Sequence, residues 1–392
     1  MDKLIYMDNS ATTPVKKEVL DAMLPYFSEM YGNPSSIYSL GSKSKIAVED
    51  AREKVAKAIG ANSKEIFFTA GGSEADNWAL KGIAYKNKDK GNHIITTKVE
   101  HHGILHTCQY LEKQGFKVTY LDVDRYGMVD LDQLIESIND ETILISIMFA
   151  NNEIGTIQPI KEIGEIAKEK GVYFHTDAVQ AIGHIDIDVE ELNIDLLSMA
   201  AHKFYGPKGI GALYIRRGVR IDPLISGGAQ EKNRRAGTEN VPGIVGMGKA
   251  IELAYENLEE SNERLVKLRD KLIERIFDNI DHVRLNGHPT KRLPGNVNIS
   301  FEFIEGESLL LSLDMEGIAA SSGSACTSGT LDPSHVLLAI GLPHEIAHGS
   351  LRLSLGDFNT EEELDYVVEK LVEIVKRLRA MSPLYEQVKE EK

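Results

Sequence analysis

Cysteine and long apolar runs are the two features that this 392-residue sequence most clearly lacks. Its two cysteines, Cys108 and Cys326, lie far apart and in very different surroundings, which argues against a disulfide framework and indicates a reducing compartment. No apolar run approaches the roughly 18 residues that span a bilayer. Residues 1–6 also lack the apolar core of a signal peptide. We therefore expect a cytoplasmic protein without membrane contact.

Positive charge is the next scarcity. The chain has 44 lysines and arginines against 60 acidic residues, which gives a formal net charge of -16. Such a charge repels nucleic acid and anionic membranes, and no basic face large enough to reverse this is visible. The remaining composition is that of an ordinary globular chain, long enough for one large domain and a smaller one.

Strands and helices alternate through the first half of the chain. This order predicts a mostly parallel sheet with helices on both faces. The predicted strands are 66–69, 93–97, 117–121, 142–149, 172–176, 194–199 and 211–215. The predicted helices are 15–30, 42–59, one from residue 74, 103–114, 130–138 and 160–170.

A second, smaller domain is predicted beyond a charged helix at about 250–280. It should hold short strands near 296–303 and 350–355 and a closing helix whose capping box is Thr360 and Glu363. We assign residues 15–257 to the large domain. Residues 1–14 and 258–392 form the small one, which carries a polar loop at about 321–333.

One lysine stands at a place where chemistry is expected. Lys203 follows the apolar run 194–199 and precedes a Gly-Pro-x-Gly turn at residues 206–209. An amine among apolar walls is less easily charged and can form a Schiff base near neutral pH. A turn lysine that points to water is the simpler explanation of this residue alone, so its neighbours decide the matter.

Polar residues follow several of the predicted strands. Ligands of a parallel sheet bind beyond the carboxyl ends of its strands, so these residues should share one edge with Lys203. A glycine-rich helix start for a phosphate, an acid for a ring nitrogen, a flat histidine and a lysine are what pyridoxal phosphate requires. Each residue also has a simpler explanation, such as a helix cap or a turn, but coincidence is the weaker interpretation of the set. The residues are Gly72, Ser73, His101, Asn152, Asp177 and Gln180.

The histidines permit a zinc hypothesis as well. His102 and His106 are four residues apart on one predicted helix, with Cys108 nearby. No carboxylate or second thiol completes a ligand set at the expected spacing, so we predict no metal site. Cys108, in an apolar helix, is expected to serve packing.

Cys326 and Arg352 have unusual surroundings. The segment 321–330 has almost no apolar side chain, so Cys326 is expected to be an exposed thiol on a mobile loop, although a surface cysteine without function fits equally. Arg352 lies within a strand-like run, where an unpaired charge would be costly. A carboxylate that binds it through two hydrogen bonds is the expected partner.

Taken together, several segments resemble the cysteine desulfurases of the NifS/IscS type, which are pyridoxal-phosphate enzymes of the class V aminotransferase superfamily. The likeness runs over nearly the whole chain, and the polar loop resembles the long-loop group. It implies the type I fold of these transferases, with a mostly parallel seven-stranded sheet and a smaller α+β domain. The segments are 12–14, 32–36, 100–101, 151–155, 177–180, 202–209, 235–238 and 323–326.

The resemblance also implies how the cofactor is held. Lys203 would carry it as a Schiff base, Asp177 would pair with the ring nitrogen, and Gln180 would contact the ring hydroxyl. His101 would stack on the ring and help to move protons. The phosphate would be held by Gly72, Ser73 and His202, and by Thr238 from the other subunit of a homodimer.

By the same resemblance, Asn152 and Arg352 would bind the carboxylate of L-cysteine, and Cys326 would be the nucleophile. The products would be L-alanine and a persulfide on Cys326, whose sulfur passes to an iron–sulfur scaffold or another acceptor. One departure is Ala200, which stands where the family commonly has a serine that binds the phosphate. A selenocysteine lyase, an aminotransferase and a non-catalytic scaffold remain the alternatives.

Overall fold

The computed structural model describes residues 4–322 and 333–390, the last four of these by their backbone alone. Its centre is a seven-stranded sheet in the order β2-β8-β7-β6-β5-β3-β4. Only β8 runs antiparallel to its neighbours; the other pairs are parallel, as predicted. The strands are β2 (Ile66–Thr69), β3 (His93–Thr97), β4 (Lys117–Leu121), β5 (Thr142–Ser146), β6 (Tyr173–Asp177), β7 (Leu196–Ala200) and β8 (Gly211–Ile215).

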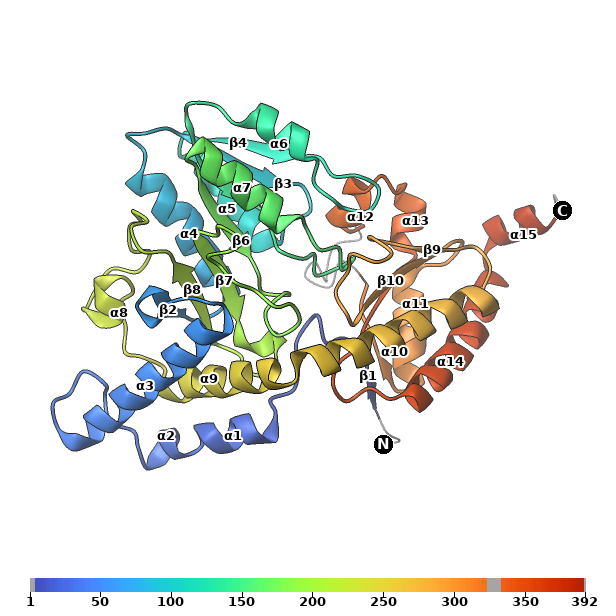
Figure 1. Cartoon of the computed structure of the whole chain (residues 1–392). Coiled ribbons are helices and arrows are strands. Elements are labelled where there is room, and N and C mark those ends of the chain that lie inside the picture. The colour runs from blue at the N-terminus through green and yellow to red at the C-terminus, as the bar shows by residue number, and fades with distance from the viewer. Residues whose placement is uncertain (1–3, 323–332, 391–392) are drawn as a thin grey trace.

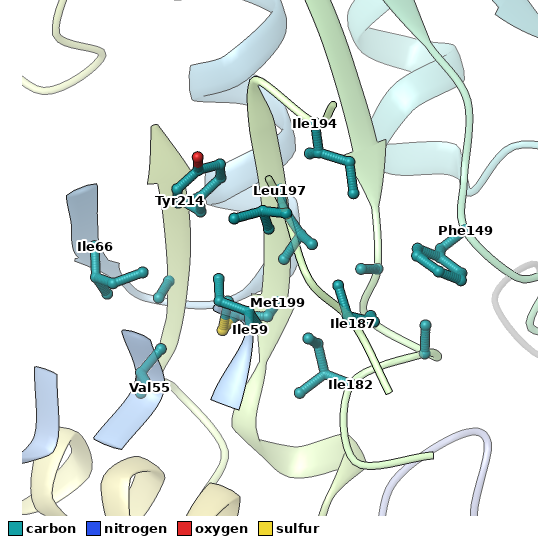
Figure 2. Packing of buried hydrophobic residues seen from close by; sticks show 14 of the residues in the cluster. Val55, Ile59, Ile66, Phe149, Ile182, Ile187, Ile194, Leu197, Met199 and Tyr214 are labelled. Carbon is teal, nitrogen blue, oxygen red and sulfur yellow. The ribbon is translucent and has the colours of Figure 1, made fainter. Parts of the chain in front are cut away.

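Helices cover both faces of this sheet (Figure 1). Successive side chains of β7 alternate between the two cores, because neighbouring residues of a strand point to opposite faces. Leu197 and Met199 pack with the first group of helices, as Figure 2 shows in part, whereas Leu196 packs with the second. The first group is α3 (Ser39–Ala58), α6 (Leu131–Ser137), α7 (Ile160–Lys170) and α9 (Val241–Glu256), and the second is α4 (Gly72–Lys86) and α5 (His102–Lys113).

The C-terminal part has its own sheet and its own apolar core. In Figure 1, α9 and α10 run end to end and join the two parts. A further apolar cluster lies where the parts meet and includes Met148 and Leu337. The elements are β9 (Val283–Leu285), β10 (Asn296–Phe301) and β12 (Ser350–Ser354), the pair β1 (Ile5–Tyr6) and β11 (Ile318–Ala319), and the helices α10 (Leu258–Asn279), α11 (Gly306–Met315) and α14 (Glu361–Arg379). The domain boundaries stay a prediction.

Two predicted helices were wrong in their extent. The helix expected over 15–30 is split between α1 and α2, because Pro25 has no N–H for a continuous helix and starts a new one instead. The bridging helix is likewise interrupted at Asn257, whose backbone is not helical. The strand expected over 142–149 ends at Ser146. The capping box of Thr360 and Glu363 is confirmed.

Short elements complete the chain. They are α1 (Lys17–Met23), α2 (Pro25–Ser28), η1 (Ser63–Glu65), η2 (Ala201–Lys203), α8 (Gln230–Asn233), α12 (His335–Ala339), α13 (His344–His348) and α15 (Pro383–Glu390). Within residues 4–322 and 333–390, the helices are all too short or too polar to cross a membrane.

Candidate active site

A cavity of about 310 Å³ lies at the carboxyl ends of the large sheet, where the sequence predicts a ligand. Loops that follow β2, β3, β5, β6 and β7 line it, together with the N-terminal arm and β12. Most of the predicted site residues meet here, although their roles stay predictions. They are Gly72, Ser73, His101, Asn152, Asp177, Gln180, His202, Lys203 and Arg352.

Lys203 is held at the end of β7 by a tight return of the chain. The backbone passes through η2 into a turn, and β8 then pairs antiparallel with β7. Gly206 permits this close packing, because a Cβ atom there would lie 2.8 Å from both the Cβ and the carbonyl oxygen of Ala201. The amine Nζ of Lys203 donates to the carbonyl oxygens of Ser10 and Ala11, at 2.5 and 2.8 Å.

The N-terminal arm therefore forms one wall of the site. The side-chain amide of Gln180 donates to the same Ser10 oxygen at 2.9 Å. His202 contacts Thr12 through its Nδ1 atom at 3.2 Å. Burial, followed by the charges of Lys203 and Lys208, lowers the pKa of His202 to about 4, so its ring is neutral at neutral pH.

Asp177 and His101 form the polar floor. The Asp177 carboxylate accepts from the Val179 N–H at 2.9 Å. Burial raises its pKa, while His101, the Val179 N–H and Lys203 act against this rise. The Nδ1 atom of His101 accepts from the Gly103 N–H at 3.0 Å, which leaves the proton of a neutral ring on Nε2. Burial is the main cause that lowers the pKa of His101.

The start of α4 offers a place for a phosphate. The helix begins at Gly72 and leaves N–H groups of its first turn unpaired within the helix, as in other anion-binding helix starts. A Cβ atom on residue 72 would lie 2.7 Å from Val179 and 3.6 Å from Ala200. Glycine therefore lets this helix start approach the ends of β6 and β7.

Arg352 is 3% exposed and reaches the cavity from β12. Its Nη2 atom donates to the Asp8 carboxylate at 2.8 Å, and Nη1 donates to the backbone oxygen of Asn152 at 3.1 Å. The expectation of a carboxylate that binds through two hydrogen bonds was wrong. The carboxylate uses one nitrogen, because the neighbouring nitrogen faces the turn at Asn152.

The remaining predicted residues lie elsewhere. Thr238 is exposed and does not line this cavity, and Cys326 lies outside the described residues. Cys108 is buried in an apolar cluster, which confirms its packing role. The rings of His102 and His106 stack with centroids 5.0 Å apart.

Sequence reasoning missed Ser10, Ala11 and Asp76, which also line the cavity. The first two contribute backbone oxygens, which no sequence pattern reveals. Asp76 lies inside α4, where an acidic residue ordinarily faces water. Its position four residues after Gly72, one turn from the helix start, was the available signal.

Comparison with known proteins identifies the fold. The sequence profile of the aminotransferase class-V family matches residues 5–367. The chain belongs to this family. Within it, the chain is 68% identical to the cysteine desulfurase IscS of Methanosarcina thermophila, over 98% of this chain and 95% of the relative.

Solved structures agree with this assignment. A NifS-like protein superposes with a TM-score of 0.91 at 43% identity and covers 96% of this chain and 100% of its own. A structure of SspA in complex with cysteine superposes with a TM-score of 0.81 at 40% identity, over 91% of this chain and 100% of its own. The chain is thus a cysteine desulfurase of the class-V family.

Cysteine desulfurases of this family depend on pyridoxal phosphate, and the cavity fits that group. It brings together a buried carboxylate, an amine and a helix start that glycine keeps clear. These are the complements of a pyridine nitrogen, an aldehyde and a phosphate. Asp177, Lys203 and Gly72 are therefore the residues expected to hold these three parts.

Proposed function

We propose that this chain removes the sulfur from L-cysteine, releases L-alanine and holds the sulfur first as a persulfide on Cys326. One observation carries the proposal: a single cavity holds an amine, a buried carboxylate and a guanidinium, on Lys203, Asp177 and Arg352. An amino acid has a matching carboxylate for Arg352 and a Cα proton for Lys203. The similarity to a cysteine desulfurase and to a structure that holds cysteine points to the same substrate.

When bound, pyridoxal phosphate supplies an electron-withdrawing ring that spreads the negative charge left after a proton leaves Cα. Gly72, Ser73 and His202 would hold the phosphate, Gln180 would contact the ring hydroxyl, and Asp177 would keep the ring nitrogen protonated. Lys203 would take the Cα proton on its Nζ atom. His101 would cover the ring and donate from Nε2, since Gly103 already occupies Nδ1.

Arg352 would orient the substrate. Its guanidinium is held from two sides, by Asp8 and by the backbone of Asn152, and the residue lines the cavity. A bound carboxylate would then place the sulfur of cysteine at a defined distance from the ring. Such positioning lowers the entropy cost of the reaction.

Cys326 would act as a thiolate. A bond forms between its sulfur and the substrate sulfur, the Cβ–S bond of the substrate breaks, and the electron pair left on carbon takes up a proton to give alanine. The step is balanced without an external oxidant, because the carbon is reduced as the sulfur becomes a persulfide. The thiolate is the nucleophilic form of cysteine, which favours a reducing compartment, and we place the protein in the cytoplasm.

The working protein is proposed to be a homodimer that donates sulfur to an iron–sulfur scaffold or another acceptor. Large apolar side chains stand exposed along the first 46 residues, which is unusual for a monomer. In a dimer, the exposed Thr238 of one subunit could reach the phosphate of the other. The exposed side chains are Leu20, Leu24, Phe27, Tyr31, Ile37, Tyr38 and Ile46.

Cysteine turnover with Cys326→Ser tests this function. With L-cysteine and a thiol reductant, the parent protein should form alanine and sulfide in equal amounts, and Cys326→Ser should lose at least about a hundredfold of this rate. Cys108→Ala is the matched control, because its thiol lies in the core, and it should keep the activity. Sulfide release by Cys326→Ser at the parent rate would refute the proposed nucleophile.

A further inference from the structure

Asp76 is a buried acid that the proposed mechanism does not use. It projects from α4 into the wall of the active-site cavity and is 1% exposed. One of its side-chain atoms lies within 4.8 Å of Asp177 and of His101. Its Oδ1 atom has no hydrogen-bond partner among the described residues. A carboxylate so placed would be poorly stabilised.

Among the residues that the structure describes, no lysine or arginine forms an ion pair with Asp76. The Nε2 atom of His175 lies 3.9 Å from Oδ1 of Asp76. Its ring is held between the hydroxyls of Ser146 and Ser198, both at 2.9 Å. Burial lowers the pKa of His175 to about 3, so this histidine is neutral at neutral pH.

Asp177 has the better surroundings for a charge. The Val179 N–H donates to it, and Lys203 and His101 face it across the cavity. The Ser198 hydroxyl favours Asp76 as an anion. Burial is the main cause that raises the pKa of Asp76 well above its ordinary value, and the charges of Asp177 and Glu100 add to it. Two acids this close in a buried site cannot both ionise readily.

We propose that Asp76 and Asp177 share one proton, which rests on Asp76, and that Asp76 is thereby a positioning residue that keeps Asp177 available as the carboxylate facing the ring nitrogen. The inference rests on the proposed role of Asp177 toward the cofactor. As with other interacting acids, the pair should titrate as a unit. Loss of the proton from Asp76 at alkaline pH would place a second negative charge beside Asp177.

Infrared difference spectroscopy on the cofactor-free protein tests the location of the proton. At neutral pH, the parent spectrum minus that of Asp76→Asn should show the carbonyl stretch of a protonated carboxylic acid. Asn77→Ala, at the adjacent position of α4, is the control that should leave this band in place. A difference that contains only carboxylate stretches would mean that Asp76 is ionised and would overturn the proposal.

A second variant measures the coupling between the two acids. In Asp177→Asn, Asp76 should lose its proton at a pH about one unit or more below that in the parent, because the neighbouring negative charge is gone. Its carbonyl band should disappear at that lower pH. An unchanged midpoint would contradict a shared proton. If Asp76→Asn fails to fold, Ser198→Ala replaces it. In Ser198→Ala, the pH at which Asp76 loses its proton should rise relative to the parent, because the hydroxyl that favours the anion is removed. No rise in this pH would overturn the proposal.

The holoenzyme gives the functional readout. The visible band of the bound cofactor should change at alkaline pH in the parent, where Asp76 loses its proton, and this change should be absent in Asp76→Asn, because asparagine has no proton to lose. A purely structural role would leave its midpoint unmoved. The infrared result does not depend on turnover. A protonated Asp76 in a protein that cannot desulfurate cysteine would therefore refute the proposed function and not the shared proton.

Discussion

Glu100 directly precedes the active-site histidine and is itself buried in a protonated form. Its Oε1 atom accepts from the Thr97 hydroxyl at 2.7 Å and from the Met148 N–H at 3.0 Å. Burial raises the pKa of Glu100 to about 8, even though both hydrogen bonds favour its charged form. The folded protein therefore binds a proton at neutral pH that the unfolded chain releases.

This proton makes stability depend on pH. From the ordinary value of 4.5 up to about 8, the free energy of unfolding should fall by about 1.4 kcal/mol per pH unit on account of Glu100, because the folded state binds more protons than the unfolded one. Glu100→Gln removes this contribution and keeps an oxygen for Thr97 and Met148. In chemical denaturation, the free energy of unfolding of the variant should thus increase relative to that of the parent as the pH rises from about 5 to 7.

The control for this prediction is Glu136→Gln, an exposed residue of α6. The difference between its free energy of unfolding and that of the parent should stay constant over the same pH range. If the free energies of unfolding of Glu100→Gln and of the parent changed in parallel with pH, Glu100 would already be ionised in the folded protein, and the prediction would be wrong.

At the scale of residues, the sequence predicted the side chains that directly follow strands, because strand ends share one edge of a parallel sheet. Asp177 and Lys203 were found in this way. Asp76 was not, because it follows no strand directly; its only signal was its position one helical turn after Gly72. A carboxylate was correctly predicted as the partner of Arg352, but not its single hydrogen bond. The second nitrogen of the guanidinium donates to the backbone oxygen of Asn152 instead.

Among the elements, the segment α8 is held in an unusual shape. Glu231, Lys232 and Asn233 have positive φ angles of 44°, 57° and 64°. Arg52 of α3 binds both oxygens of the buried Glu231 at 2.8 Å, and the Phe68 N–H of β2 donates to the same carboxylate at 2.9 Å. This ion pair anchors the segment that leads toward Thr238.

Arg52→Ala should leave the Glu231 carboxylate buried and unpaired. We expect the free energy of unfolding to fall by about 3–5 kcal/mol in chemical denaturation, as for other broken buried pairs. Lys117→Ala, which breaks the exposed pair with Glu141, should change it little. Equal effects of the two variants would mean that the Arg52–Glu231 pair does not anchor α8.

Most helices and strands were predicted in place, because apolar runs and helical periodicity mark them directly. The errors occurred at interruptions that one residue decides. Pro25 was inside a predicted helix although it lacks an N–H. Asn257 carries no such signal: it is exposed, and its non-helical backbone ends α9.

For the whole molecule, we predict that the exposed apolar side chains of the first 46 residues form the interface of a dimer. Ile37 is fully exposed in the single chain, at 100%. Formation of the dimer would bury an unpaired charge at residue 37, which is costly. Ile37→Glu should therefore shift the protein toward the monomer in sedimentation analysis. Met315→Glu alters another strongly exposed residue, on α11, and should leave the dimer intact. A dimer unaffected by Ile37→Glu would place the interface elsewhere.

The central claim is that sulfur leaves cysteine for Cys326. Its most direct test is a single turnover of the holoenzyme with L-cysteine and no reductant, followed by mass spectrometry of the peptides and quantification of alanine. The account predicts one extra sulfur atom on the peptide that contains Cys326 and one alanine per sulfur. A keto acid in place of alanine, or sulfur on Cys108 instead of Cys326, would contradict it.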